Sequence, residues 1–317
     1  MGLGKTTKIA VLFPGQGSQY IGMGKAFAEQ SPAARGLFEK AEAITGIAIQ
    51  RLCFEGPFTE LTKTINLQPA LTAVNLVCWQ AMEQAGVTPS FFAGHSLGEY
   101  SALYAANVLT YEDTLAVVTE RGRLMQREAE RFPGGMRAIL GLTIEEVRET
   151  LESLIDGGIV VVANHNAENQ VVISGELPAL ERATEVLTVR KGKVIPLGVS
   201  GAMHSPLVKD AVPDFISLLD TIMVSPPRVP IVFNVTAAVE PGPESIRRIM
   251  AGQIASAVKW VDIIRFLQAQ GVRTFIEVGP KKVLTGLLCK ILAKGYEHQG
   301  LQVEDPETLT RCLAAMG

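Results

Sequence analysis

The motif Gly-His-Ser-Leu-Gly at residues 94–98 has the residue types and the spacing that prepare a serine for nucleophilic attack. Apolar residues 91–93 precede it and the Ala-rich stretch 99–106 follows it, so we predict a strand, a sharp turn and a helix. The glycines allow a tight turn, and Ser96 would lie at the positive end of the helix, where a developing oxyanion is stabilised. The motif alone is equally compatible with a plain strand-to-helix connection, so the rest of the chain must decide.

A serine nucleophile needs a general base, and the chain offers four histidines: His95, His165, His204 and His298. His95 adjoins the serine, and neighbouring side chains at a sharp turn usually point apart. His298 lies in a polar stretch near the C-terminus, whereas His204 lies in a loop of Gly, Ser and Pro residues at 200–206. The base need be close to the serine only in space. We therefore predict that His204 is the base.

Two further features could contribute to a binding site. The apolar run 8–13 predicts a buried strand, and the loop at 14–19 that follows it is rich in Gly and Gln. Loops at the carboxyl ends of parallel strands bind ligands, and glycines let backbone amides face an anion. Arg121 lies in the helix predicted for 111–131, where an arginine among apolar residues usually extends its charged end to the surface. Taken alone, Arg121 only suggests a site.

The order of strands and helices predicts an α/β fold with two parts. Alternating strands and helices indicate a mainly parallel sheet in an α/β-hydrolase-like large domain, expected at 1–132 and 199–317. Between these segments, residues 133–198 follow the order β-α-β-β-α-β, which is typical of a ferredoxin-like subdomain. Within the large domain we expect residues 46–64 to be less regular than the helix before them and residues 229–235 to form a strand.

The composition excludes several classes of protein. The chain has 317 residues, 47% of them hydrophobic and 19% charged, which is ordinary for a protein with a sizeable core. Its net charge of −3 favours neither nucleic acid nor an anionic membrane as a partner. Four scattered cysteines, no membrane-length apolar run and no signal-peptide core predict a cytoplasmic protein with reduced thiols. We expect no bound metal.

Five motifs together resemble the malonyl-CoA:acyl carrier protein transacylase family, which is related to the acyltransferase domains of fatty-acid and polyketide synthases. The resemblance covers nearly the whole chain, and five motifs in order with compatible spacing are far more specific than any one of them. In chain order the motifs are Phe13-Pro14-Gly15-Gln16-Gly17-Ser18-Gln19, the segment 94–100 around Ser96, Arg121-Gly122, Gly201-Ala202-Met203-His204-Ser205 and Glu277-Val278-Gly279-Pro280.

The resemblance implies roles for five residues at the reacting group. Ser96 would attack the thioester of malonyl-CoA, and His204 would accept its proton. The backbone amides of Gln16 and Leu97 would form the oxyanion hole. Arg121 would pair with the free carboxylate of the malonyl group through two parallel hydrogen bonds, which a lysine would not reproduce.

The resemblance also implies roles around these residues. Met125 would line the acyl pocket, Asn166 would make a polar contact from the subdomain, and the backbone carbonyl of Gln253 would orient His204. Many malonyl-type members carry Phe where this chain has Met203, and some carry Asn-Pro in the segment that contains Gln253. Met is apolar and adaptable, so the pocket is expected to persist, while the strictness of selection for malonyl over methylmalonyl or acetyl stays open.

The reaction implied by the resemblance is a two-step transfer. A malonyl-Ser96 ester forms first, and the phosphopantetheine thiol of a holo acyl carrier protein then takes the malonyl group, which predicts ping-pong kinetics. Malonyl-CoA is then a substrate, and no permanently bound cofactor is expected. We expect a monomer that supplies extender units for fatty-acid or polyketide synthesis, a choice that the sequence leaves open.

Two alternatives compete with this interpretation. A serine esterase or thioesterase of the α/β-hydrolase type needs an acidic residue between serine and histidine, and Asp113 and Asp156 lie in that interval. The ferredoxin-like insert, Arg121 and the glycine-rich loop argue against it. A carrier-protein-binding module without catalysis would share the fold, but the intact Ser96 and His204 argue against loss of activity.

Overall fold

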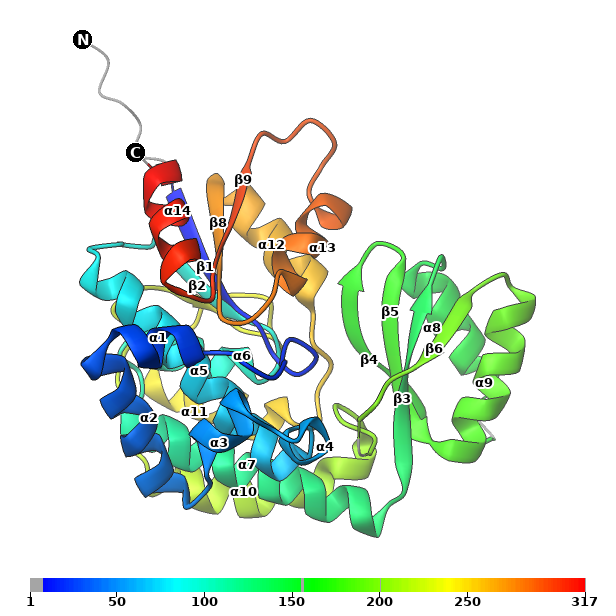
Figure 1. Cartoon of the computed structure of the whole chain (residues 1–317). Coiled ribbons are helices and arrows are strands. Elements are labelled where there is room, and N and C mark those ends of the chain that lie inside the picture. The colour runs from blue at the N-terminus through cyan, green and yellow to red at the C-terminus, as the bar shows by residue number, and fades with distance from the viewer. Residues whose placement is uncertain (1–7, 155–156, 200, 317) are drawn as a thin grey trace.

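The computed structural model describes residues 8–154, 157–199 and 201–316, which contain two sheets of different kinds (Figure 1). The larger sheet has the strand order β7-β2-β1-β8-β9, and its neighbouring strands all pair in parallel. Its strands are β1 (Lys8–Phe13), β2 (Phe91–Gly94), β7 (Ile231–Val232), β8 (Val272–Val278) and β9 (Gln299–Val303).

Helices cover both faces of the larger sheet (Figure 1). In chain order they are α1 (Lys25–Gln30), α2 (Pro32–Thr45), α3 (Ile49–Phe54), α4 (Phe58–Leu61), α5 (Thr64–Gln84), α6 (Gly98–Ala105), α7 (Tyr111–Arg131), the 3-10 helix η2 (Pro206–Ala211), α10 (Val212–Leu219), α11 (Pro243–Gln253), α12 (Trp260–Ala269), α13 (Val283–Ile291) and α14 (Pro306–Met316).

The central strand β1 is buried on both faces because its side chains alternate between two cores. Val11 and Phe13 belong to a core that includes residues of α5 and α7. Ala10 and Leu12 pack with residues of α12 and α13 on the opposite face. This two-sided burial explains why the run 8–13 is almost entirely apolar instead of alternating between apolar and polar residues.

The register of the central strands brings two loops together. Phe13 at the end of β1 lies opposite Gly94 at the end of β2, and the backbone N–H of His95 donates to the Phe13 carbonyl oxygen at 3.0 Å. The glycine-rich loop after β1 and the sharp turn after β2 therefore leave the same edge of the sheet. This carboxyl edge is where open α/β sheets bind their ligands.

The smaller sheet is antiparallel, with the strand order β4-β5-β3-β6. The chain order β-α-β-β-α-β and this strand order confirm the predicted ferredoxin-like part of an α/β fold. Its elements are β3 (Gly134–Leu140), α8 (Ile144–Glu152), β4 (Val160–Ala167), β5 (Gln170–Glu176), α9 (Leu177–Val189) and β6 (Lys193–Pro196).

The two faces of the smaller sheet have different neighbours. Ile139 and Val171 form a separate core with α8 and α9, which lie on the side turned away from the larger sheet (Figure 1). Met136 and Val172 belong instead to the same core as Val11. The smaller sheet is therefore packed against the rest of the chain by one apolar face.

A backbone contact also ties the smaller sheet to the segment before α12. Asn164 of β4 pairs in parallel with Val258, whose N–H donates to the Ala163 carbonyl at 2.8 Å. The His165 N–H donates to the Val258 carbonyl at 2.9 Å. The stretch between α11 and α12 thus acts as a short additional strand beside β4.

Two stretches differ from their expectations, and four further elements were not expected. Residues 46–64, expected to be less regular, contain the short helices α3 and α4, whose buried Ile49 and Leu61 hold them by tertiary packing. At six and four residues, these helices are too short to display a helical period in the sequence. The strand expected at 229–235 is limited to Ile231–Val232. Strand β9 and the helices η2, α10 and α14 were not predicted.

The domain boundaries expected after residues 132 and 198 stay a prediction, and residues 1–7, 155–156, 200 and 317 lie outside the described residues. Among the described helices, none is both long enough and apolar enough to cross a membrane. In the same part of the chain, no three His, Cys, Asp or Glu side chains are grouped as a metal site.

Candidate active site

Ser96 lies at a strained turn between β2 and α6. Its φ of 51° is in the left-handed region, which costs a residue other than glycine about 1–3 kcal/mol. At this turn the backbones of Gly94, Gly98 and Phe13 lie in close contact. A Cβ on Gly94 would lie 2.0 Å from the Gly98 carbonyl carbon, and a Cβ on Gly98 would lie 2.0 Å from the Phe13 carbonyl oxygen. The two motif glycines are therefore needed for close packing.

His204 is brought to Ser96 by the loop that precedes η2. Its Nε2 lies 2.7 Å from the Ser96 Oγ, and its Nδ1 lies 2.9 Å from the Ser256 carbonyl oxygen and 3.1 Å from that of Gln253. A carbonyl can only accept, so Nδ1 must carry the proton and Nε2 is free to accept the serine proton. Gln253 was predicted as the carbonyl partner, whereas the nearer Ser256 was not.

The surroundings of His204 keep its imidazole neutral. Burial, followed by the positive charge of Arg121, lowers the pKa of His204 to about 3. The two carbonyl contacts oppose this shift without reversing it. A neutral imidazole is the form that can take a proton from a serine.

Arg121 of α7 is fully buried beside Ser96, which differs from the usual surface position of an arginine. Its guanidinium donates to the Gln68 Oε1 at 2.8 Å, to the Gln253 Oε1 at 3.1 Å and to the Ser96 Oγ at 3.2 Å. It also lies over the ring of Tyr100, 5.4 Å from the ring centroid. Among the described residues, no carboxylate forms an ion pair with Arg121. The site therefore holds a buried positive charge whose contacts are neutral.

The glycine-rich loop passes directly over the turn. A Cβ on Gly15 would lie 2.4 Å from the His95 carbonyl oxygen and 3.6 Å from the Leu97 amide nitrogen. The amides of Gln16 and Leu97 donate to no acceptor in the part of the chain that the structure describes. Two amides next to the nucleophile are thus free to donate to an oxyanion.

A cavity of ≈ 120 Å³ opens between the turn and the smaller sheet. Met125 and Met203 contribute apolar walls, and Asn166 reaches in from β4, where its Oδ1 lies 2.8 Å from the His95 Nε2. Apolar walls with a few polar groups are typical of small-molecule sites. The cavity is lined by Gln16, His95, Ser96, Met125, Met136, Asn164, Asn166, Val172, Leu197, Val199, Met203 and His204.

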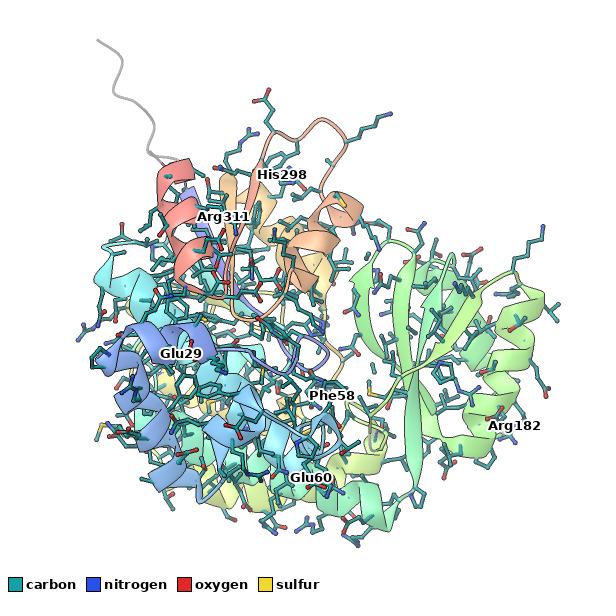
Figure 2. The ribbon with its side chains drawn as sticks, viewed as in Figure 1. Glu29, Phe58, Glu60, Arg182, His298 and Arg311 are labelled. Atoms are coloured by element: carbon teal, nitrogen blue, oxygen red, sulfur yellow. The ribbon has the colours of Figure 1, made fainter. Side chains whose placement is uncertain are left out.

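Other candidate residues lie elsewhere. His298 is exposed near β9 and contacts the Tyr296 carbonyl (Figure 2). Asp113 accepts a hydrogen bond from Thr110 at the start of α7, and Asp156 lies outside the described residues. Because the Nδ1 of His204 faces two carbonyls, Asp113 does not complete a hydrolase triad.

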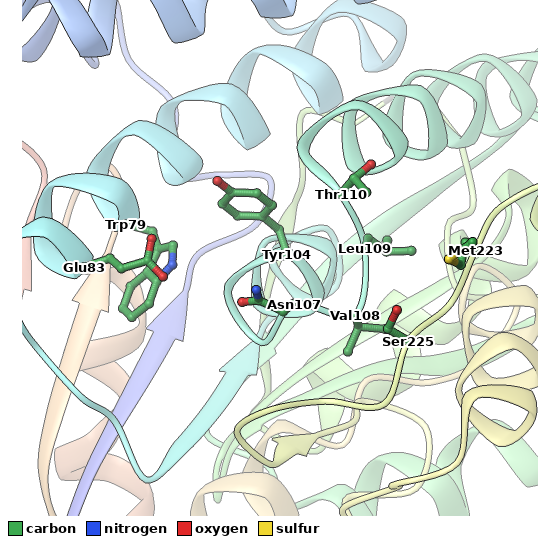
Figure 3. Close-up of a pocket in the computed structure, with 9 residues that line it drawn as sticks. All are labelled: Trp79, Glu83, Tyr104, Asn107, Val108, Leu109, Thr110, Met223 and Ser225. Carbon is green, nitrogen blue, oxygen red and sulfur yellow. The ribbon is translucent and has the colours of Figure 1, made fainter.

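A second cavity of ≈ 250 Å³ lies between α5, the α6–α7 connection and the loop before β7 (Figure 3). Neither Ser96 nor His204 lines it, and Glu83 is the only charged residue in its wall. The larger cavity therefore lacks the groups that acyl transfer needs.

Two buried polar residues at the site were not predicted. Glu99 follows the turn on α6, and burial raises the pKa of its carboxyl to about 7. Asn234 follows β7, and its Oδ1 accepts the Ser96 N–H at 2.7 Å. Their side chains form a hydrogen bond although 135 positions separate them in sequence, so no local sequence pattern predicts this contact.

A serine on a sharp turn, a histidine that can accept its proton and two free amides beside them define a serine-dependent acyl-transfer class of protein. Comparison with known sequences identifies the family within this class. The family model for the acyl transferase domain matches residues 11–306. A malonyl CoA-acyl carrier protein transacylase of Bacillus subtilis is 41% identical over 305 residues, which cover 96% of this chain and 95% of that protein. The chain therefore belongs to the malonyl CoA-acyl carrier protein transacylase family, and the resemblance predicted from the motifs is confirmed.

Solved structures have the same fold. An acyl-carrier-protein S-malonyltransferase from Burkholderia pseudomallei is 38% identical with a TM-score of 0.92, covering 97% of this chain and 99% of that one. A malonyl-transacylase solved in complex with its type II PKS acyl-carrier protein is 36% identical with a TM-score of 0.93, covering 98% and 100%.

Proposed function

We propose that this protein transfers the malonyl group from malonyl-CoA to the phosphopantetheine thiol of a holo acyl carrier protein. The family supports this reaction, and the observation that carries it is the buried Arg121, whose guanidinium has neutral partners 3.2 Å or less from its nitrogens. An acyl group that ends in a carboxylate would place a negative charge in direct contact with this guanidinium.

In the first step, the Oγ of Ser96 attacks the thioester carbonyl while its proton passes to the Nε2 of His204. The carbonyl oxygen becomes an oxyanion, which accepts hydrogen bonds from the amides of Gln16 and Leu97. When the tetrahedral intermediate collapses, the carbon–sulfur bond breaks and the CoA sulfur takes the proton from His204. The product is a malonyl ester on Ser96.

In the second step, the carrier thiol gives its proton to the same neutral His204 and attacks the ester carbonyl. The bond between the carbonyl carbon and the Ser96 oxygen then breaks, and the serine recovers the proton. Each step exchanges an ester and a thioester, so the proposed chemistry needs no resident cofactor and predicts ping-pong kinetics.

The remaining site residues are proposed to shape the acyl pocket. Met125 and Met203 would contact the malonyl carbons, and Asn166, held by His95, would offer a polar group at the opposite wall. Gln253 would orient His204 through its carbonyl oxygen.

We further propose that the protein acts as a monomer in the cytoplasm. Four free cysteines, three of them buried, support a reducing compartment. The supply of extender units for fatty-acid or polyketide synthesis follows from the proposed reaction.

Intact-mass spectrometry after brief incubation with malonyl-CoA, acetyl-CoA or methylmalonyl-CoA tests the proposal, with Ser96→Ala as the control. We expect a malonyl-sized adduct on the wild type that is absent from Ser96→Ala and is discharged by holo carrier protein. CoA release without an adduct, equally fast from acetyl-CoA, would support a hydrolase instead. Neither an adduct nor CoA release would support a binding module.

A further inference from the structure

Glu99 is a fully buried carboxylate one helical turn from the nucleophile, and the proposed reaction does not use it. Its oxygens accept three hydrogen bonds, from the Asn234 backbone N–H at 2.6 Å, from the Asn234 Nδ2 at 2.6 Å and from the Gln253 Nε2 at 3.0 Å. All three partners are donors, so the ionised carboxylate satisfies every contact without a proton of its own.

The same two amide side chains hold the backbone of Ser96 on both sides. The Oδ1 of Asn234 accepts the Ser96 N–H at 2.7 Å, while its Nδ2 also donates to the Gly94 carbonyl at 2.6 Å. The Nε2 of Gln253 donates to the Ser96 carbonyl at 2.9 Å. Ser96 has a strained φ of 51°, and these hydrogen bonds hold its backbone in that conformation.

Gln253 extends the connection to the other two reacting side chains. Its Oε1 accepts from Arg121 at 3.1 Å, and its backbone carbonyl accepts from the His204 Nδ1 at 3.1 Å. The amide of Gln253 is therefore fixed in one orientation, with its nitrogen toward Glu99 and its oxygen toward Arg121. Arg121 can only donate and the Ser96 carbonyl can only accept, and the carboxylate of Glu99 adds a third contact that favours the same orientation.

We propose that Glu99 is a positioning residue for acyl transfer, which acts through Asn234 and Gln253 to hold the Ser96 backbone and the carbonyl partner of His204 in their reactive arrangement. Glu99 touches neither the substrate nor a reacting atom. The proposal rests on the proposed function only for the identity of the acyl group, since the geometry serves any acylation of Ser96.

The substitution Glu99→Gln tests this role because it keeps the shape and replaces one acceptor oxygen by a donor. In either orientation the new NH₂ would face a donor, at Gln253 or at Asn234, so one of these residues would have to move and weaken its hold on the Ser96 backbone. A misplacement of about 1 Å lowers the rate of an oriented reaction by roughly a hundredfold. We expect Ser96 acylation to slow at least tenfold, with KM for the acyl donor nearly unchanged.

Glu277→Gln is the matched control. Glu277 is also a fully buried carboxylate that accepts three hydrogen bonds, but these come from Leu284 and Thr285 at the start of α13. Its loss is expected to lower the melting temperature as much as Glu99→Gln does, while leaving the acylation rate at the wild-type value.

The experiment measures the second-order rate constant for labelling of Ser96 by a fluorophosphonate, followed by intact mass, with the melting temperature of each variant recorded. This reagent needs Ser96 and His204 but no malonyl group. A wild type that is labelled yet forms no malonyl ester would refute the proposed function and leave the role of Glu99 testable.

Labelling of Glu99→Gln at least tenfold slower than that of Glu277→Gln would support the proposal. A folded Glu99→Gln labelled at the wild-type rate would overturn it. If Glu99→Gln does not fold, Glu99→Asp takes its place, since the shorter carboxylate keeps the charge but cannot reach both amides. A folded Glu99→Asp labelled at the wild-type rate would likewise overturn the proposal.

Discussion

The Oγ of Ser96 and the Nε2 of His204 lie 2.7 Å apart although 108 residues separate them in the chain. Both residues have left-handed backbones, with φ of 51° and 56°. Each such conformation costs about 1–3 kcal/mol and persists only where surrounding contacts hold it. The fold therefore holds the two side chains in the arrangement that the proposed proton transfer needs, without any substrate.

Arg121→Ala is expected to lower kcat/KM for malonyl-CoA by about 30-fold to 5000-fold, because removing one partner of a buried charge pair costs about 2–5 kcal/mol. Reaction with acetyl-CoA should be spared or should increase. Arg121→Lys keeps the charge without the planar fork and should give an intermediate loss. Steady-state kinetics with malonyl-CoA and acetyl-CoA measures both values of kcat/KM. An equal loss of kcat/KM with both esters would mean that Arg121 assists Ser96 and does not bind the malonyl carboxylate.

The fall in acylation rate at low pH is expected to follow the protonation of Glu99 and not that of His204. Burial raises the pKa of Glu99 to about 7, so its carboxylate gains a proton as the pH falls through this value. The added O–H would meet a donor at Gln253 or Asn234, and the acylation rate should fall. Since the pKa of His204 is lowered to about 3, this base stays neutral over the same range.

The profile is measured as the rate of Ser96 acylation between pH 5 and 9, buffers being matched in ionic strength. In Glu99→Gln the rate should be lower but flat across the region near pH 7. A limb that persists unchanged in Glu99→Gln would assign it to another group.

Gly94→Ala is expected to lower the free energy of unfolding by about 3 kcal/mol, because the added methyl would overlap the backbone of Gly98 and overpacking costs 1–3 kcal/mol or more. Gly36→Ala in α2 is the control, since outside the adjoining backbone of its own helix no atom lies within 4 Å of the added Cβ. That change should stabilise the protein by about 0.5–1 kcal/mol. Urea unfolding of both variants measures the difference, and equal stability would contradict the packing around the turn.

Asp113→Ala is expected to leave kcat within about twofold of the wild type, because its carboxylate contacts Thr110 at the start of α7 and not His204. In a Ser-His-Asp triad, the loss of the aspartate lowers kcat by about 10⁴-fold. Initial rates of malonyl transfer distinguish these outcomes. A drop of that size would favour the hydrolase alternative.

Local patterns in the chain are enough to predict the alternation of strands and helices around the central sheet, the ferredoxin-like part and the turn at Ser96. Each of these depends on residues close together in sequence: apolar periods, glycine spacing and the change from strand to helix. The short helices α3 and α4 escaped prediction because they depend on packing partners far along the chain.

The arrangement of the site depends on folding in a way that these patterns do not reveal. Arg121 is buried because Gln68 and Gln253 approach it from other helices, and the Ser256 carbonyl reaches His204 across 52 residues. Glu99 meets Asn234 because β2 and β7 are neighbours in the sheet. Which distant segments supply hydrogen-bond partners depends on three-dimensional packing. A buried donor or acceptor therefore gains its partner only when the sheet and its helices have assembled.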